Sequence, residues 1–308
     1  GYSLLLSPFY IASGQNYLIA CFIVDLLAAT AVILLCRKIL KTLDTSLPVI
    51  NLFTLFTSFF IYYFYYTGST DSISIAFFLA ALSGSLTAIK TNQKWAAMAV
   101  MSGGFLLLSA GLKYLFFPVV FTIPVFLFIY GWQNRLPGAK KAAFIMLAIL
   151  ATGIAALFIY QKSISGTGAH ISSPGRGFFP EHLLRAHPFI PSSFITPNSL
   201  RKIPGNVEAT AMNVFRVVHL FVYAIVLFIA ARSFVRDGLR KASLLRTFLF
   251  LALSITLAIS FVLGILSLLV DKELMPPDRW WTYVEDARYY GLANILVHLV
   301  IFILFQQY

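Results

Sequence analysis

The residues most suited to chemistry gather just ahead of the last long apolar run of the chain. In the segment DRWWTYVEDARYYG, Glu285, Asp286 and Arg288 stand together, followed by Tyr289. The planar guanidinium of Arg288 suits bidentate contact with a phosphate, and the two carboxylates could orient it or accept hydrogen bonds from sugar hydroxyls. A juxtamembrane salt bridge between Asp286 and Arg288, flanked by interfacial tyrosines, is the alternative interpretation.

Two further charged residues each stand alone between apolar runs. Lys113, in GLKYLFFP, is the only cation between the fourth and fifth runs, and with nearby helix ends it could bind an anion. The alternative is that its amine snorkels to the lipid headgroups. Asp71, in TGSTDSIS, could contact a substrate or could belong to the N-cap region of the third run.

A third charged residue, Asp25, lies inside the first apolar run, where a lone carboxylate costs at least about 2.5 kcal/mol unless it is paired or neutral. It is either a lipid-site or proton-linked carboxylate or a hydrogen-bonded residue of a packed bundle. His170, His182 and His187 fit no zinc spacing, so we predict no metal site. The chain also lacks the motifs that bind nucleotide cofactors, and no cofactor can be assigned.

The elements that must position these residues are apolar helices. Of 308 residues 59% are hydrophobic and 11% charged, which is too apolar for a soluble domain. Helices of about 20 apolar residues cross a bilayer. We predict an all-α, polytopic membrane bundle with about nine spans. The predicted spans are 17–36, 47–66, 73–89, 95–112, 115–131, 142–160, 214–234, 247–270 and 291–308.

The charges sort by loop and predict an orientation. Alternate connections hold 13 of the 23 Lys and Arg residues against two acids, Asp44 and Asp237, and are predicted to be cytoplasmic. The formal charge of +12 therefore reflects topology, and no nucleic-acid partner is predicted. The N-terminal segment 1–16 falls on the extracytoplasmic side. We expect one transmembrane domain, 1–308, with an external, partly helical loop at 161–213.

Four segments, taken in order, resemble the polytopic GT-C glycosyltransferases, with protein mannosyltransferases and aminoarabinose transferases as the nearest type. They are GYSLLLSPFY, TGSTDSISIAFFLAAL, SAGLKYLFFPVVFTIPVFLFIY and EDARYYGLANILVHL. The resemblance implies an integral, multi-pass membrane enzyme with an extracytoplasmic active site. It implies a polyprenyl-phosphate-linked sugar as donor and a lipid, glycan or protein as acceptor, with membrane lipids as surroundings.

The resemblance also implies roles for individual residues. Lys113 and Arg288 would bind the lipid phosphate, since cations that neutralise charge developing on a leaving group lower the barrier. Glu285, Asp286, Tyr289 and Asp71 would contact substrate. The main catalytic carboxylate of the family lies in a loop expected upstream of Gly1, so the catalytic group itself is unknown, and the resemblance leaves a divalent metal open.

Two rival functions remain open at this stage. An O-antigen polymerase or ligase type of enzyme also has many spans and a long external loop, in which Arg176, Arg185, His182 and His187 would act. A membrane transporter is the rival that is not an enzyme. It should place several ionisable residues within the membrane and contain repeated, broken helices.

Overall fold

The computed structural model describes residues 2–64, 70–113, 116–165, 243–269 and 291–307, with a few isolated positions between 221 and 232. Within these ranges the chain is helical and contains no strand. The helices are α1 (Tyr2–Ala12), α2 (Tyr17–Thr42), α3 (Leu47–Phe64), α4 (Asp71–Thr91), α5 (Trp95–Leu112), η2 (Val119–Phe121), α6 (Thr122–Gln133), α7 (Pro137–Ser165), α10 (Leu244–Leu269) and α12 (Gly291–Gln307).

The helices confirm the all-α class and the membrane character of the chain. Four described helices are long and apolar enough to cross a membrane, namely α2, α4, α5 and α7 up to Tyr160. The remaining described helices coincide with predicted spans, except for α1, which is new. The predicted span 214–234 lies outside the described residues apart from isolated positions, as does most of the loop 161–213. The count of nine spans therefore stays a prediction.

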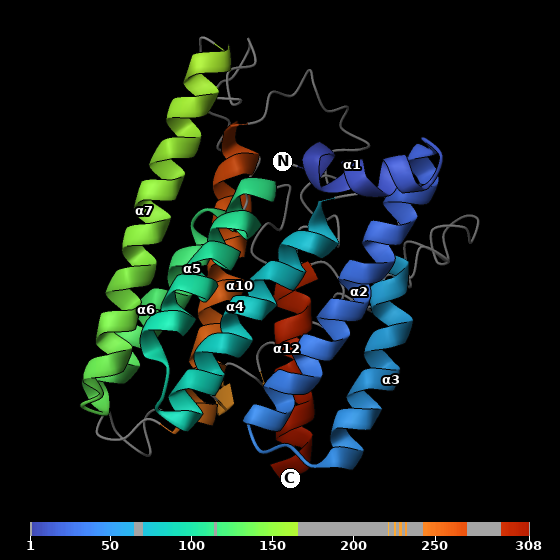
Figure 1. The fold of residues 1–308 in the computed structure, drawn as a ribbon. Helices are drawn as coiled ribbons and strands as arrows, with labels where there is room; N and C mark the ends of the chain where they lie inside the picture. The colour runs from blue at the N-terminus through green and yellow to red at the C-terminus, as the bar shows by residue number, and fades with distance from the viewer. Residues whose placement is uncertain are drawn as a thin grey trace.

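Helix α1 was not predicted, and it lies across the end of the bundle near the start of α2 (Figure 1). The chain reverses after it through Gly14 (φ 67°) and Gln15 (φ 65°), both in the left-handed region. Asn16 then caps α2, because its Oδ1 accepts a hydrogen bond from the Ile19 N–H at 3.2 Å. This turn lets α1 lie across the end of the bundle while α2 runs along it (Figure 1).

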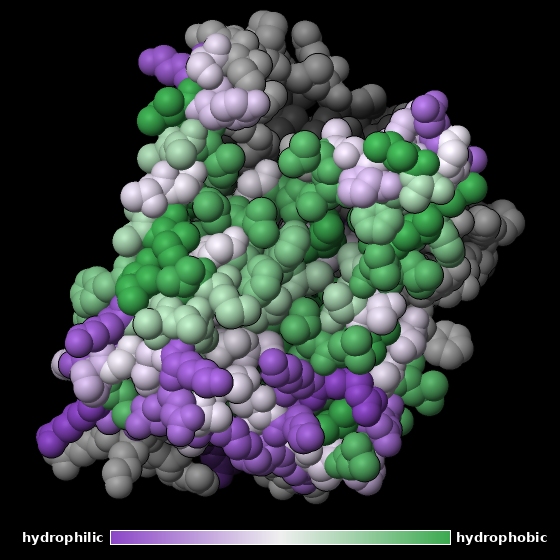
Figure 2. Space-filling model, viewed as in Figure 1, coloured by the Kyte–Doolittle hydropathy of each residue, from purple (hydrophilic) through white to green (hydrophobic). Residues whose placement is uncertain are grey.

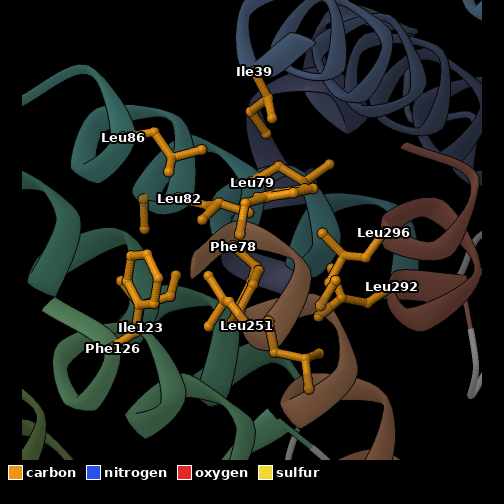
Figure 3. Packing of buried hydrophobic residues seen from close by; sticks show 14 of the residues in the cluster. Ile39, Phe78, Leu79, Leu82, Leu86, Ile123, Phe126, Leu251, Leu292 and Leu296 are labelled. Atoms are coloured by element: carbon orange, nitrogen blue, oxygen red, sulfur yellow. The ribbon is translucent and has the colours of Figure 1, made fainter. Parts of the chain in front are cut away.

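Helix α4 forms the centre of the bundle. It packs against α2 on one side and α5 on the other, and α5 packs in turn against α7. Residues of α4 lie together with residues of α2, α6, α10 and α12 in the hydrophobic core (Figure 3). The labelled members of this core are Ile39, Phe78, Leu79, Leu82, Leu86, Ile123, Phe126, Leu251, Leu292 and Leu296. A helix buried on nearly all faces fixes the positions of its own ends, where the polar residues lie.

Charge separates the two ends of the bundle. The cations of one end, here called the basic end, are Arg37, Lys38, Lys41, Lys90, Lys94, Arg135, Lys140, Lys141 and Arg246. Figure 2 shows the corresponding hydrophilic band below a broad hydrophobic surface. The opposite end holds the start of α4 and the end of α5 (Figure 1). The described cations that the sequence assigns to cytoplasmic connections thus lie at one end of the bundle.

Candidate functional site

A buried ion pair joins α4 to α5 at the end opposite the basic end. Asp71 is the first residue of α4, and Lys113 caps the C-terminus of α5. The Lys113 Nζ contacts the Asp71 Oδ1, and the two side chains are only 8% and 7% exposed. An anion at a helix N-terminus and a cation at a C-terminus are both favoured by the helix dipoles. The helix ends therefore stabilise the same charges that the pair brings together.

The surroundings of this pair are apolar. The Lys113 Nζ lies 5.5 Å from the centre of the Phe116 ring, a cation–π distance, and Phe116 packs edge-on against Phe78. One turn below, the Ser109 Oγ donates a hydrogen bond to the Ser74 carbonyl oxygen at 2.8 Å, with both residues fully buried. This hydrogen bond helps to fix the register of α4 against α5. In that register the Asp71 carboxylate lies next to the Lys113 amine.

A second carboxylate reaches the same level from α2. The Ser72 Oγ donates a long hydrogen bond to the Asp25 Oδ1 at 3.4 Å, and Asp25 is 7% exposed. Asp25 lies two turns into α2, yet it is level with the first turn of α4, because α2 begins well beyond the start of α4. Asp25 therefore lies near the end of the bundle that contains the start of α4, although it is two turns inside its own helix. Two aspartates and one lysine from three helices form what we call the polar cluster: Asp25, Asp71, Ser72 and Lys113.

Helix α1 packs beside the polar cluster. Leu6 forms a small apolar cluster with Ala20, Cys21 and Val24 of α2, and Phe9, Tyr10 and Ile73 pack against it. Ile73 directly follows Ser72 in α4 and packs against the apolar cluster that contains Leu6 of α1. Helix α1 therefore lies next to the polar cluster, on the side of α2. This cover limits access of water from that direction and strengthens the electrostatic interactions inside.

The polar cluster offers distinct chemical capabilities. The carboxylates of Asp25 and Asp71 can accept hydrogen bonds from hydroxyl or ammonium groups, and the Lys113 amine can bind a phosphate by exchanging its carboxylate partner. With all three groups ionised the cluster carries more negative than positive charge. Among the described residues no group of three or more His, Cys, Asp or Glu could hold a metal ion.

The structure tests the sequence-based site only in part. It brings Lys113 and Asp71 together, although nothing in the sequence pairs these two residues. Snorkelling of Lys113 to the headgroups is wrong, because its side chain points inward to Asp71. The N-cap of α4 is Thr70, and Asp71 follows it. The other predicted site residues lie outside the described residues: Glu285, Asp286, Arg288 and Tyr289, as well as Arg176, His182, Arg185 and His187 of the rival hypothesis.

The hydrogen bond between Ser72 and Asp25 could not be predicted from the sequence. Asp25 was singled out for its cost in an apolar run, but nothing in the sequence pointed to its partner. Ser72 was noted only as a residue of a capping segment. The two residues are 47 positions apart, and their contact depends on the register of α2 against α4.

Comparison of the chain with protein-family models, with curated proteins and with solved structures gives no match. The arrangement of its own residues is therefore the basis for a proposal on function.

Proposed function

We propose that this protein is a multi-pass membrane glycosyltransferase that transfers a sugar from a polyprenyl-phosphate donor to an extracytoplasmic acceptor. The observation that carries the proposal is the buried Asp71–Lys113 pair, with Asp25 beside it, at the end opposite the basic end. By the positive-inside rule the basic end is cytoplasmic, so the polar cluster belongs to the extracytoplasmic side. The resemblance of the sequence to GT-C enzymes agrees with this placement.

In this mechanism Lys113 is the anchor for the donor phosphate. Before the donor binds, Asp71 holds the amine in place. The phosphate then replaces Asp71 as the partner of Lys113, and the released carboxylate accepts a hydrogen bond from a sugar hydroxyl. Arg288 supplies a second cation, and Glu285, Asp286 and Tyr289 contact donor or acceptor. In the transfer step the acceptor oxygen bonds to the anomeric carbon as the bond from that carbon to the phosphate oxygen breaks, and the polyprenyl phosphate leaves. Charge that develops on this phosphate is neutralised by groups already in position.

The test is transfer of a labelled sugar from its polyprenyl phosphate by the full-length protein in proteoliposomes. Lys113→Gln should lower the transfer rate by about 100-fold or more, the usual effect of removing one group that stabilises transition-state charge. Asp71→Asn should lower the rate less, because it weakens only a hydrogen bond to a sugar hydroxyl. The matched control is the exposed Lys90–Asp44 pair at the basic end, where Lys90→Gln and Asp44→Asn should leave the rate within a factor of about two. A wild-type rate in folded Lys113→Gln protein would exclude the anchoring role.

A transporter is the second candidate, because three ionisable side chains are buried together in the bundle. In that case Asp25, Asp71 and Lys113 would bind a substrate or a coupling ion in turn as the protein alternates between two states. Uptake of an intact labelled substrate into proteoliposomes, abolished by Asp25→Asn and without any bond cleavage, would favour the transporter over the glycosyltransferase.

A further inference from the structure

Three helix ends meet at one corner of the basic end, where α5 begins, α6 ends and α7 begins. A β-carbon on Gly138 would lie 2.3 Å from the Trp95 Cδ1, so the indole ring packs directly on the α7 backbone. A β-carbon on Gly131 would lie 2.8 Å from that of Ala139, which shows an equally close approach of α6 to α7. We call this region the α5–α7 corner. Its cations are Lys94, Arg135, Lys140 and Lys141.

The positive charge of the α5–α7 corner is not compensated within the part of the chain that the structure describes. Elsewhere at the basic end, Lys90 pairs with Asp44 at 2.5 Å, and Arg37 donates a hydrogen bond to Thr54 at 2.7 Å. The four corner cations have no such side-chain partner among the described residues. The first turn of α7 contains no acidic residue either, so the positive end of its dipole adds to the same field.

The segment 235–242 lies outside the described residues, and its sequence carries a net positive charge. It follows a predicted span and falls on the same side by the charge pattern, and its charged residues are Arg236, Asp237, Arg240 and Lys241. Three cations against one acid add positive charge. Within the described residues the corner therefore presents uncompensated positive charge that favours binding of an anion.

The surface next to these cations is apolar and aromatic. Trp132 is 69% exposed on α6, and one turn further from the basic end the ring of Phe128 meets that of Phe144 from α7, with centroids 5.5 Å apart. Residues 128 and 132 lie on one face of α6, and residues 141 and 144 lie on one face of α7. The order from the end of the bundle inward is cations, then a tryptophan, then an exposed aromatic pair.

That order matches an anionic phospholipid, with its charged headgroup, its interfacial region and its acyl chains. We propose that the α6–α7 face binds one anionic phospholipid, whose phosphate contacts Arg135 and Lys141 and whose acyl chain lies along Phe128 and Phe144. Tryptophan prefers the headgroup level of a bilayer, and basic residues at helix ends bind anionic headgroups. A soluble phosphate would use the cations but would leave the aromatic pair without a role.

The experiment is a lipid titration of the full chain in detergent, read by native mass spectrometry. The probes are dioleoyl phosphatidylglycerol, dioleoyl phosphatidylcholine and glycerol 3-phosphate. The corner variant is Arg135→Gln with Lys141→Gln. Its control is Lys38→Gln with Lys41→Gln, which removes two exposed cations of α2 from the same end. Phe144→Ala tests the acyl-chain contact, and melting curves without added lipid show that each variant is folded.

We expect the wild type to bind phosphatidylglycerol more tightly than phosphatidylcholine. The corner variant should weaken phosphatidylglycerol binding by roughly 30-fold, the combined effect of two headgroup contacts, while the α2 control stays within about threefold. Phe144→Ala should weaken the binding of phosphatidylglycerol and of phosphatidylcholine to the same extent. The proposal is overturned if the two double variants lose equal affinity, if the two lipids bind equally well, or if glycerol 3-phosphate displaces phosphatidylglycerol at similar concentration.

Discussion

Lys113 and Lys90 each pair with an aspartate of another segment, but at opposite ends of the bundle and in opposite environments. Lys113 and Asp71 are buried and lie at helix ends whose dipoles favour them. Lys90 and Asp44 have side chains that are 41% and 82% exposed. The first pair is shielded from solvent within the polar cluster, whereas the second is exposed to solvent. The ion pair at one end is thus buried, whereas the ion pair at the other end is exposed to its surroundings.

The largest loss of stability is expected when one charge of the buried pair is removed. Lys113→Met should lower the free energy of unfolding by about 3–5 kcal/mol, because Asp71 would remain buried without its cation. Lys113→Met combined with Asp71→Leu should recover most of this loss. Denaturant titration in micelles measures both variants. A single variant as stable as wild type would mean that the pair is not buried as described.

A charge reversal sharpens the same test. Asp71→Lys combined with Lys113→Asp keeps an ion pair but places each charge at the unfavourable helix end. This double variant should remain less stable than wild type by roughly 1–2 kcal/mol, the contribution expected from two helix dipoles. Full recovery would show that the dipoles contribute nothing here.

The next largest effect is expected at the basic end, where shape rather than charge holds the helices. Gly138→Ala should destabilise the protein by about 1–3 kcal/mol, because the new methyl group would overlap the Trp95 ring. Gly104→Ala is the matched control, since nothing lies within 4 Å of its β-carbon position. That change should be neutral or stabilising by up to about 1 kcal/mol. Melting temperatures compare the two, and equal shifts would contradict the close packing of Trp95.

A smaller effect is expected for the Ser72 hydroxyl. Ser72→Ala removes a hydrogen bond to the Asp25 carboxylate at 3.4 Å and should cost about 1 kcal/mol. Ser85→Ala, in the same helix, removes a hydrogen bond to a neutral carbonyl of its own helix and should cost less. Denaturant midpoints measure the stability of both variants. A larger loss for Ser85→Ala than for Ser72→Ala would mean that the hydrogen bond from Ser72 does not stabilise Asp25.

The smallest effect belongs to the exposed pair. Lys90→Met should change the free energy of unfolding by less than about 1 kcal/mol, and the change should shrink at high salt because exposed pairs are screened. Melting curves at low and high ionic strength measure it. A loss as large as that of Lys113→Met would remove the contrast between the two ends.

The sequence predicts the helices better than their ends. The first predicted span stops at residue 36, but α2 continues to Thr42 through Arg37, Lys38 and Lys41. An apolar-run criterion stops at charge, whereas the helix does not, since cations are favourable in a last turn. Helix α1 escaped prediction because it has only 11 residues and contains Pro8.

The candidate site was predictable as a set of residue types but not as a set of partners. Lys113 and Asp71 stood out because charges are rare in this chain. Their pairing could not be foreseen, because it joins residues 42 positions apart and depends on the register of α4 against α5. Sequence periodicity gives the face of a helix and leaves its height relative to a neighbour undefined.

The turn between α2 and α3 has a consequence for the order of assembly. Its Ser46 N–H donates a hydrogen bond to the Gln306 side-chain oxygen of α12 at 2.6 Å, across 260 positions of the chain. Phe53 and Phe56 of α3 also pack on Phe302 of α12. At the usual rate of synthesis, on the order of 5–20 residues per second, α3 waits roughly 10–50 s for this partner. During that interval lipid, or a membrane insertion factor, must cover the face of α3 that α12 later occupies.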